Sequence, residues 1–244
     1  MIPVCYVFRY DREKREKALK RLLCSLSSIL FQQGIPNIHI LDASSEKVNI
    51  PPHYENLLFR FHKPQSGSFN KAVLMNHLIK NYLADREYCI LADIDIIFEP
   101  DYIKKMEAYT QGEPVRVVGY NQGAAHEFLT SDFNEGMRLI KEKGEMSYRC
   151  GESPGLGLLH IPSFLKIRGF NEEFKEYGPE DCELNRRLAY INKYIYDKDI
   201  VNIHLYHEQN DNNFANQNVE IYNESEKRFQ SGDLVRNNDK WGEY

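Results

Sequence analysis

The sequence predicts an α/β fold with a mostly parallel central sheet flanked by helices. Short apolar runs rich in β-branched residues alternate with segments of helical periodicity, and the first connections between them are short. Strands are expected over residues 2–8 and 37–42, with a long helix over 13–33 between them. A strand, a helix and a strand joined in this way form a right-handed unit with parallel strands. The 244 residues are 42% hydrophobic, enough for one large domain or two small ones.

The later elements follow from the same periodicities. Helical spacing of apolar residues, with Gly and Pro at the ends, predicts helices over 72–82, 101–109, 132–143, 163–167 and 180–190. Strands are expected over 57–61, 88–98, 115–120 and 200–207. Residues 121–148 are predicted to be a variable insertion or lid. The Asn-rich end has a weak helical phase up to residue 229, and residues 230–244 are expected to be peripheral or partly disordered.

Composition narrows the class of protein. The net charge is -5, with 31 basic and 36 acidic residues and no basic block, so a nucleic-acid partner is not expected. The five cysteines are scattered and form no CxxC motif, which indicates reduced, buried thiols and a cytoplasmic setting. The N-terminal apolar run is too short for a signal peptide, and no apolar run approaches the roughly 18 residues of a transmembrane span. Any membrane association would be peripheral.

Two carboxylates interrupt the most apolar stretch of the chain. Asp93 and Asp95 lie between the apolar runs 89–92 and 96–98. Buried carboxylates are costly unless they are paired or bind a cation. Residues two apart on a strand point to the same side, so these two can share one site. The alternative is a strand end with solvated or capping acids.

A second acidic pair follows a chain break. Gly178-Pro179 precedes Glu180 and Asp181, which begin a predicted helix. These acids either stabilise the first turn of the helix through its dipole or present a carboxylate to a cleft.

Two histidines end the last predicted strand. His204 and His207 are three apart and would face opposite sides of a regular strand. Both can bind one metal only if the strand ends or bends between them. By itself the His-x-x-His pattern is weak support for a metal site.

Other candidates have equally ordinary alternatives. Asp42 ends the second strand, where parallel sheets bind ligands, but it can also cap a turn. Lys71 and Asn76 lie in a helix opened by Ser68 or Asn70, and both positions suit a helix surface. The glycine-rich segment around Gly155 and Gly157 fits neither GxGxxG nor a Walker motif, so these glycines indicate a tight turn or close approach to a ligand.

Taken in order, these features resemble the GT-A nucleotide-sugar glycosyltransferases. The shared features are NIHILDASSE, SFNKAVLMNHLI, CILADIDIIFEPDYI, a glycine-rich segment, GFNEEFKEYGPEDCELNRRL and HLYH. The nearest group is that of the β-1,4-galactosyltransferases, with their chondroitin-polymerase and N-acetylgalactosaminyltransferase relatives. The resemblance covers roughly residues 1–208. It implies a Rossmann-like GT-A domain with a nucleotide-binding half over about 1–120, an acceptor-side half over about 121–208 and a polar extension over 209–244.

On the donor side, the resemblance implies the following roles. Asp95 and His207 are expected to bind Mn2+ or another divalent cation, with His204 as a further ligand. Asp93 is expected to contact the donor's ribose or the outer shell of the metal. The remaining donor-side residues are Asp42 on uracil, Lys71 and Asn76 along the nucleotide, and Gly155 and Gly157 beside the transferred sugar.

On the acceptor side, Asp181 resembles the catalytic base of inverting members. Glu180 is expected beside it on the acceptor sugar, and Tyr177 in the acceptor site. Tyr177 replaces the Trp of the galactosyltransferase motif and Pro179 replaces its second glycine. These departures leave the acceptor open.

The resulting hypothesis is a metal-dependent inverting glycosyltransferase. It would move galactose, N-acetylgalactosamine or a similar sugar from a UDP-sugar to a glycan acceptor. The resemblance and the Asn/Lys/Ile-rich composition suggest a bacterial enzyme of surface polysaccharide biosynthesis, in the cytoplasm or at the inner face of the membrane. The alternatives are a retaining N-acetylgalactosaminyltransferase-like enzyme, whose relatives usually carry Asp-x-His, and a non-catalytic module that binds a sugar nucleotide or glycan.

Overall fold

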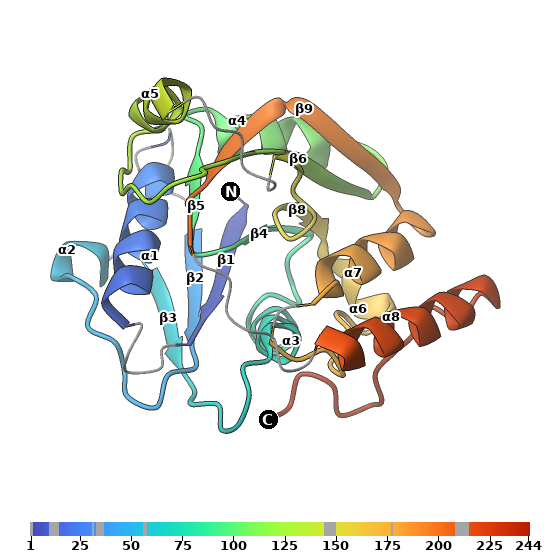
Figure 1. The fold of residues 1–244 in the computed structure, drawn as a ribbon. Helices are drawn as coiled ribbons and strands as arrows, with labels where there is room; N and C mark the ends of the chain where they lie inside the picture. Colours follow the sequence, from blue (N-terminus) through green and yellow to red (C-terminus); the bar gives the residue numbers. More distant parts are fainter. Residues whose placement is uncertain are drawn as a thin grey trace.

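The structure is a computed structural model that describes residues 2–9, 15–30, 32, 37–55, 58–143, 150–176, 178–207 and 215–244. Its strands form one nine-stranded sheet with helices on both faces (Figure 1). The strands are β1 Pro3–Phe8, β2 Asn37–Asp42, β3 Leu58–His62, β4 Tyr88–Ala92, β5 Ile96–Phe98, β6 Val115–Gly123, β7 Gly151–Glu152, β8 Gly157–His160 and β9 Lys193–His204.

The sheet has the order β3-β2-β1-β4-β8-β6-β9-β5, with β7 paired to β6. The pairs β3–β2, β2–β1, β1–β4 and β6–β9 are parallel, whereas β8 and β5 pair in the antiparallel sense. The predicted unit of strand, helix and parallel strand is therefore present as β1, α1 and β2. The carboxyl ends of β2 and β4 flank that of β1, which brings Asp42 and Asp93 to one edge of the sheet.

The helices follow the amphipathic patterns of the sequence. They are α1 Arg15–Leu30, α2 Pro52–Glu55, α3 Lys71–Tyr82, α4 Tyr102–Glu107, the 3-10 turn η2 Ala108–Thr110, α5 Phe133–Lys143, α6 Ile161–Lys166, α7 Glu180–Ala189 and α8 Ala215–Gln230. Asn70 caps α3 by accepting a hydrogen bond from the Val73 amide at 2.9 Å. Of the two predicted caps, Asn70 is thus the one in use.

Alternating residues of the central strands face two separate cores. Val4, Tyr6 and Phe8 of β1 pack under α1, whereas Cys5 and Val7 pack under α3, α6 and α7. Side chains alternate across a strand, so a strand covered on both faces reads as one continuous apolar run. This explains why the β1 and β4 sequences are apolar throughout.

The connection between β4 and β5 curls the sheet. These strands are four places apart in the sheet order but are joined by only Asp93, Ile94 and Asp95. Three residues span roughly 10 Å, which is little more than twice the strand spacing. The strands β8, β6 and β9 must therefore bend around to return β5 to β4, as Figure 1 shows.

Several strands have other boundaries in the structure than those predicted from the sequence. The last strand was predicted over 200–207, but β9 begins at Lys193 and ends at His204 because it pairs with β6 along most of its length. Residues 121–123, predicted to belong to an insertion, complete β6 instead. The predicted single strand over 88–98 is two strands, since Ile94 and Asp95 form a turn.

The prediction of a peripheral C-terminal tail is wrong. Trp241 is 7% exposed and packs against Phe164 in the core beneath α3 and α6. Arg236 lies 3.2 Å from Glu183, which also pairs with Arg187, and all three side chains are buried. The prediction failed because the tail is polar in composition, and its two buried residues, Trp241 and Arg236, do not stand out in the sequence.

The cysteines are all free thiols, but burial is less complete than predicted. Cys5 and Cys89 are buried, Cys24 and Cys150 are partly buried, and Cys182 is exposed. No helix in the described ranges is long and apolar enough to cross a bilayer.

Trp241→Ala should lower the free energy of unfolding by about 3 kcal/mol, because it removes a large buried side chain and leaves a cavity. Asp239→Ala is the matched control in the same segment. Its ion pair with Arg168 is exposed, and its loss should cost less than about 1 kcal/mol. Urea denaturation followed by circular dichroism measures both. Equal midpoints for wild type and Trp241→Ala would contradict the packing of the tail.

Candidate active site

Asp95, His204 and His207 form a group that can hold a metal ion. One ligand atom from each lies within 4.8 Å of the others. The Nε2 atom of His207 lies 3.0 Å from Oδ2 of Asp95, and Nε2 of His204 lies 3.8 Å from Oδ1. One carboxylate and two imidazoles form a donor set that suits Mn2+ or a similar borderline cation.

Strand pairing explains how residues more than 100 apart in sequence meet here. Strand β5 pairs antiparallel with the end of β9, with Ile96 opposite His204, and the Leu205 amide donates to the Asp95 carbonyl at 2.8 Å. Because β9 ends at His204, His207 lies beyond the strand and can turn back toward Asp95. The condition stated from the sequence, a strand that ends between the histidines, is met.

A hydrogen bond to the backbone sets the tautomer of His204 that can bind a metal. Its Nδ1 lies 3.0 Å from the Leu205 carbonyl oxygen, which can only accept, so Nδ1 carries the proton. In the neutral ring the lone pair is then on Nε2, the atom that faces Asp95. Burial alone would raise the pKa of Asp95, but the positive charges of His204 and His207, when their rings are protonated in the metal-free protein, outweigh burial and hold that pKa below its ordinary value. The carboxylate therefore stays ionised, as a metal ligand must.

A second charged group adjoins the first. The Lys71 ammonium lies 2.9 Å from Oδ1 of Asp93 and 3.0 and 3.2 Å from the two carboxylate oxygens of Asp181. Lys71 is the first residue of α3, Asp93 follows β4, and Asp181 lies in the first turn of α7. The predicted donor-side and base residues are thus in direct contact.

Asp93 and Asp95 occupy neighbouring sites and have different partners. The turn between β4 and β5 replaces the regular strand assumed from the sequence, so Asp93 pairs with Lys71 while Asp95 faces the histidines. Burial, together with Asp181 and Asp95, raises the pKa of Asp93 despite the opposing effect of Lys71.

Gly155 lies against two carboxylates of this second group, those of Asp181 and Asp93. A Cβ atom at this position would lie 2.5 Å from Oδ2 of Asp181 and 3.1 Å from Oδ2 of Asp93. Any larger residue would displace one of the two carboxylates. Gly157 has a different requirement: it has a φ of +119°, and a Cβ there would lie 2.1 Å from the Val117 carbonyl oxygen. Only glycine fits position 157, because β8 approaches the backbone of β6 closely there.

Glu180 is a buried acid of the site with a raised pKa. Its side chain is buried, and Oε2 has no hydrogen-bond partner in the described part of the chain. Burial first, and the neighbouring Asp181 second, raise the pKa of Glu180 to about 8. At neutral pH Glu180 is therefore protonated and can donate a hydrogen bond.

Asp42 is fully buried and already engaged. Its carboxylate accepts from the amides of Ser44 and Val48 at 3.1 and 3.0 Å and pairs with Arg60 at 2.7 Å. These contacts order the loop after β2. Uracil binding by Asp42 stays a prediction, and it would require the fully buried carboxylate to become accessible.

Asn76 is not brought into the charged cluster. Its side chain is buried, donates to the Phe170 carbonyl and to Glu172, and accepts from the Phe170 amide. These contacts tie α3 to the segment before α7. A role of Asn76 along the nucleotide stays a prediction. All three of these hydrogen bonds join Asn76 to other parts of the protein. Tyr177 lies outside the described residues.

Arg116 is a site residue that sequence reasoning missed. Its guanidinium is completely buried in β6, where it donates to Asn185 of α7 and to the carbonyl oxygens of Pro154, Leu156 and Leu158. It thereby fixes the loop of Gly155 against the helix of Asp181. The available signal was a lone charge in the apolar run VRVVGY.

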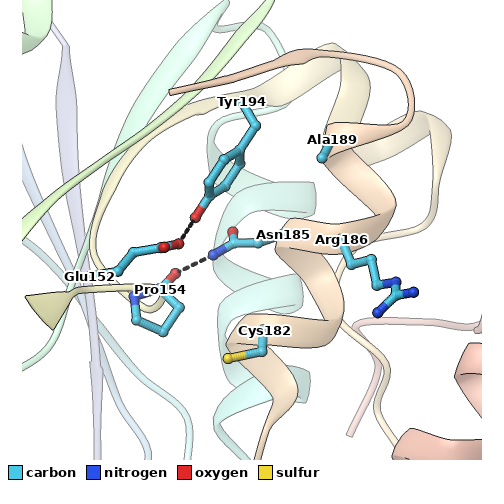
Figure 2. Close-up of a pocket in the computed structure, with 7 residues that line it drawn as sticks. All are labelled: Glu152, Pro154, Cys182, Asn185, Arg186, Ala189 and Tyr194. Atoms are coloured by element: carbon cyan, nitrogen blue, oxygen red, sulfur yellow. Dashed lines mark hydrogen bonds between the residues drawn. The ribbon is translucent and has the colours of Figure 1, made fainter. Parts of the chain in front are cut away.

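A pocket of about 220 Å³ lies beside α7 (Figure 2). Pro154 and Cys182, the chain neighbours of Gly155 and Asp181, both line it, so it adjoins the charged cluster. Figure 2 shows the Tyr194 hydroxyl bonded to Glu152 and the Asn185 amide bonded to the Pro154 carbonyl. The complete lining is Glu152, Pro154, Cys182, Asn185, Arg186, Ala189 and Tyr194.

No protein-family model and no curated protein sequence matches the chain. Solved structures match it by shape. A mannosyltransferase from Pyrobaculum calidifontis, in complex with GDP-Man and Mn2+, has 13% identity and a TM-score of 0.52, with 85% of this chain and 57% of that one covered. TarS from S. aureus with UDP-GlcNAc has 17% identity and a TM-score of 0.55, with 86% and 60% covered.

A third similar structure is the catalytic domain of Drosophila β1,4-galactosyltransferase 7 with xylobiose. It has 14% identity and a TM-score of 0.50, with 91% of this chain and 80% of that one covered. The chain thus spans 57% of the mannosyltransferase and 60% of TarS 1-349, but only 36% of a longer TarS structure. At these identities the likeness establishes the fold: the chain has the GT-A glycosyltransferase fold, and the predicted fold class is confirmed.

Glu180→Gln should stabilise the protein at pH 8 more than at pH 5. The folded pKa of about 8 lies above the ordinary value, so the native state holds a proton that the unfolded state loses, and stability falls as pH rises between the two values. Glutamine mimics the protonated acid and removes that loss. Urea midpoints at both pH values measure the effect, with Glu173→Gln on the exposed surface as the control. A stability difference that does not change with pH would show that Glu180 titrates normally.

Proposed function

We propose that the protein is a metal-dependent inverting glycosyltransferase that uses a UDP-sugar. The observation that carries the proposal is that two groups adjoin each other through the link from Asp93 to Asp95. One is a metal-type group, Asp95 with two histidines, and the other is a base-type group, Asp181 with Lys71 and Asp93. The GT-A fold supports it, because the similar structures include complexes with nucleotide sugars. The residues of both groups come from segments predicted from the sequence to act together.

The donor half is formed by Asp95, His204 and His207. These residues would hold the cation, which when bound would offset the negative charge that develops on the leaving diphosphate. Asp93 is separated from Asp95 by Ile94 alone. It is suited to accept a hydrogen bond from a ribose hydroxyl or to contact the outer shell of the cation. The preference for uridine follows from the resemblance of the sequence to the galactosyltransferase group.

The acceptor half is formed by Asp181 and Glu180, with Gly155 beside the transferred sugar on the donor side. An acceptor hydroxyl would attack the anomeric carbon as the bond from that carbon to the diphosphate oxygen breaks, and the diphosphate would leave with the bonding electrons. Asp181 would take the hydroxyl proton. Attack opposite to the leaving group inverts the anomeric centre.

Recognition of the acceptor falls to groups around that base. Glu180, protonated at neutral pH, can donate to a sugar hydroxyl through the oxygen that has no partner in the described residues. The pocket of Figure 2 begins at the next residue of α7 and extends the acceptor side. A surface glycan is the expected acceptor class, as the resemblance implies.

Binding of UDP should require a divalent cation. Isothermal titration with UDP and MnCl2 should give a dissociation constant at least about tenfold lower than the same titration with EDTA. Asp95→Asn and His207→Ala should remove this difference, because each deletes a predicted ligand. His53→Ala, on α2, is the control and should keep it. UDP affinity that is indifferent to Mn2+ would overturn the metal assignment.

Asp181→Asn should reduce glycosyl transfer by about a hundredfold or more, since it removes the base while keeping the size of the side chain. UDP binding with Mn2+ should persist. The assay is a screen of UDP-sugars against aryl glycoside acceptors, with the anomeric configuration of the product read by proton NMR. Full activity of the variant with every productive acceptor would exclude Asp181 as the base, and a retained configuration would exclude inversion.

A further inference from the structure

Lys71 contacts both halves of the proposed site. Its ammonium is 2.9 Å from Asp93 on the donor side and 3.0 Å from Asp181 on the acceptor side. Both oxygens of Asp181 accept from this one nitrogen. Among the described residues, Lys71 is the only lysine or arginine in an ion pair with either carboxylate. A base whose two oxygens are held by an ammonium is poorly placed to accept a hydroxyl proton.

The backbone of Lys71 is fixed while its side chain can move. Asn70 caps α3 and also donates to the Glu172 carbonyl at 2.8 Å, so the start of the helix is anchored. The lysine side chain has four carbon atoms between this anchor and its charge, and it can reposition the ammonium without moving the helix. Its side chain is only 13% exposed and that of Asp181 17%, so both charges depend mainly on protein partners.

The single positive charge of Lys71 is shared by two carboxylates, so it does not balance the negative charge around it. Burial alone would lower the pKa of Lys71, but Asp181, Asp93 and Glu180 outweigh it and raise that pKa, which keeps the side chain charged. One cation thus faces the two carboxylates Asp93 and Asp181. A nucleoside diphosphate bound beside Asp93 would add further negative charge on the donor side and compete with Asp181 for the ammonium.

We propose that Lys71 is an interlock between donor binding and the base. In the donor-free protein it holds both oxygens of Asp181, and when a nucleoside diphosphate sugar binds it moves to the diphosphate and frees the base. The acceptor hydroxyl can then reach Asp181 only after the donor is in place, which orders the two binding steps. Lys71 acts as a positioning residue for Asp181, and this role rests on the function proposed above.

A double-mutant cycle on UDP binding tests the interlock without any acceptor. UDP and MnCl2 are titrated into wild type, Lys71→Met, Asp181→Asn and the double variant. Lys71→Met should weaken UDP binding, because the diphosphate loses a cation. Asp181→Asn should tighten it by about threefold to tenfold, because the ammonium no longer has to leave a carboxylate. In the Lys71→Met background, Asp181→Asn should have no effect.

The effect of Asp181→Asn in the Lys71→Met background distinguishes an interlock from a simple charge effect. If Asp181 only repelled the diphosphate at a distance, its neutralisation would tighten UDP binding by the same factor with or without Lys71, and that result would overturn the proposal. So would unchanged or weaker UDP binding by Asp181→Asn. Lys71→Arg should recover part of the affinity lost in Lys71→Met. Lys80→Met, on the same helix but bonded to the Trp241 carbonyl, is the control and should bind UDP normally.

A structure of the complex with Mn2+ and UDP gives an independent readout. The Lys71 ammonium should lie beyond hydrogen-bond distance of Asp181 and within it of a phosphate oxygen. An ion pair with Asp181 that persists in the complex would overturn the interlock and leave the proposed function standing. Failure of the wild-type protein to bind UDP with Mn2+ would overturn the proposed function and, with it, the interlock.

Discussion

The three-residue connection between β4 and β5 is the constraint on which the site depends. Because Asp93, Ile94 and Asp95 must join strands four places apart in the sheet order, the sheet curls and its last strand, β5, returns to β4. The same turn rotates the two carboxylates toward different partners, the histidines after β9 and the lysine of α3. One short connection therefore builds the metal-type group and aligns it with the base-type group.

Burial of charge explains much of the remaining architecture. Asp95, Lys71 and Arg116 are all costly to bury alone, and each is paired or surrounded by carbonyl oxygens. Pairing also couples distant segments: Arg116 joins β6 to the loop of Gly155, and the buried pair of Glu183 and Arg187 joins α7 to the C-terminal segment. The helix that carries Asp181 is thus held from both sides.

Sequence patterns predicted most of the elements, though not α2, β7, β8 or the start of β9, and most of the charged residues that meet. Asp93 and Asp95 stood out because carboxylates are rare in apolar runs, and Asp181 because it follows a Gly-Pro break and matches a family motif. Arg116 was missed because a single arginine in a strand has no periodic signal, and its partners are backbone carbonyls from another segment. The buried tail was missed because Trp241 lies among polar residues, where local composition indicates disorder.

By itself the sequence determined most of the order of strands and helices, the burial of the central strands and the chemistry available at each strand end. Those features depend on local periodicity and on residue type. Only the tertiary structure decided which charges touch: that Lys71 bridges Asp93 and Asp181, and that Asp42 is already held by Arg60. Such contacts depend on sheet order, curl and the end points of strands, which are set by packing between segments far apart in the chain.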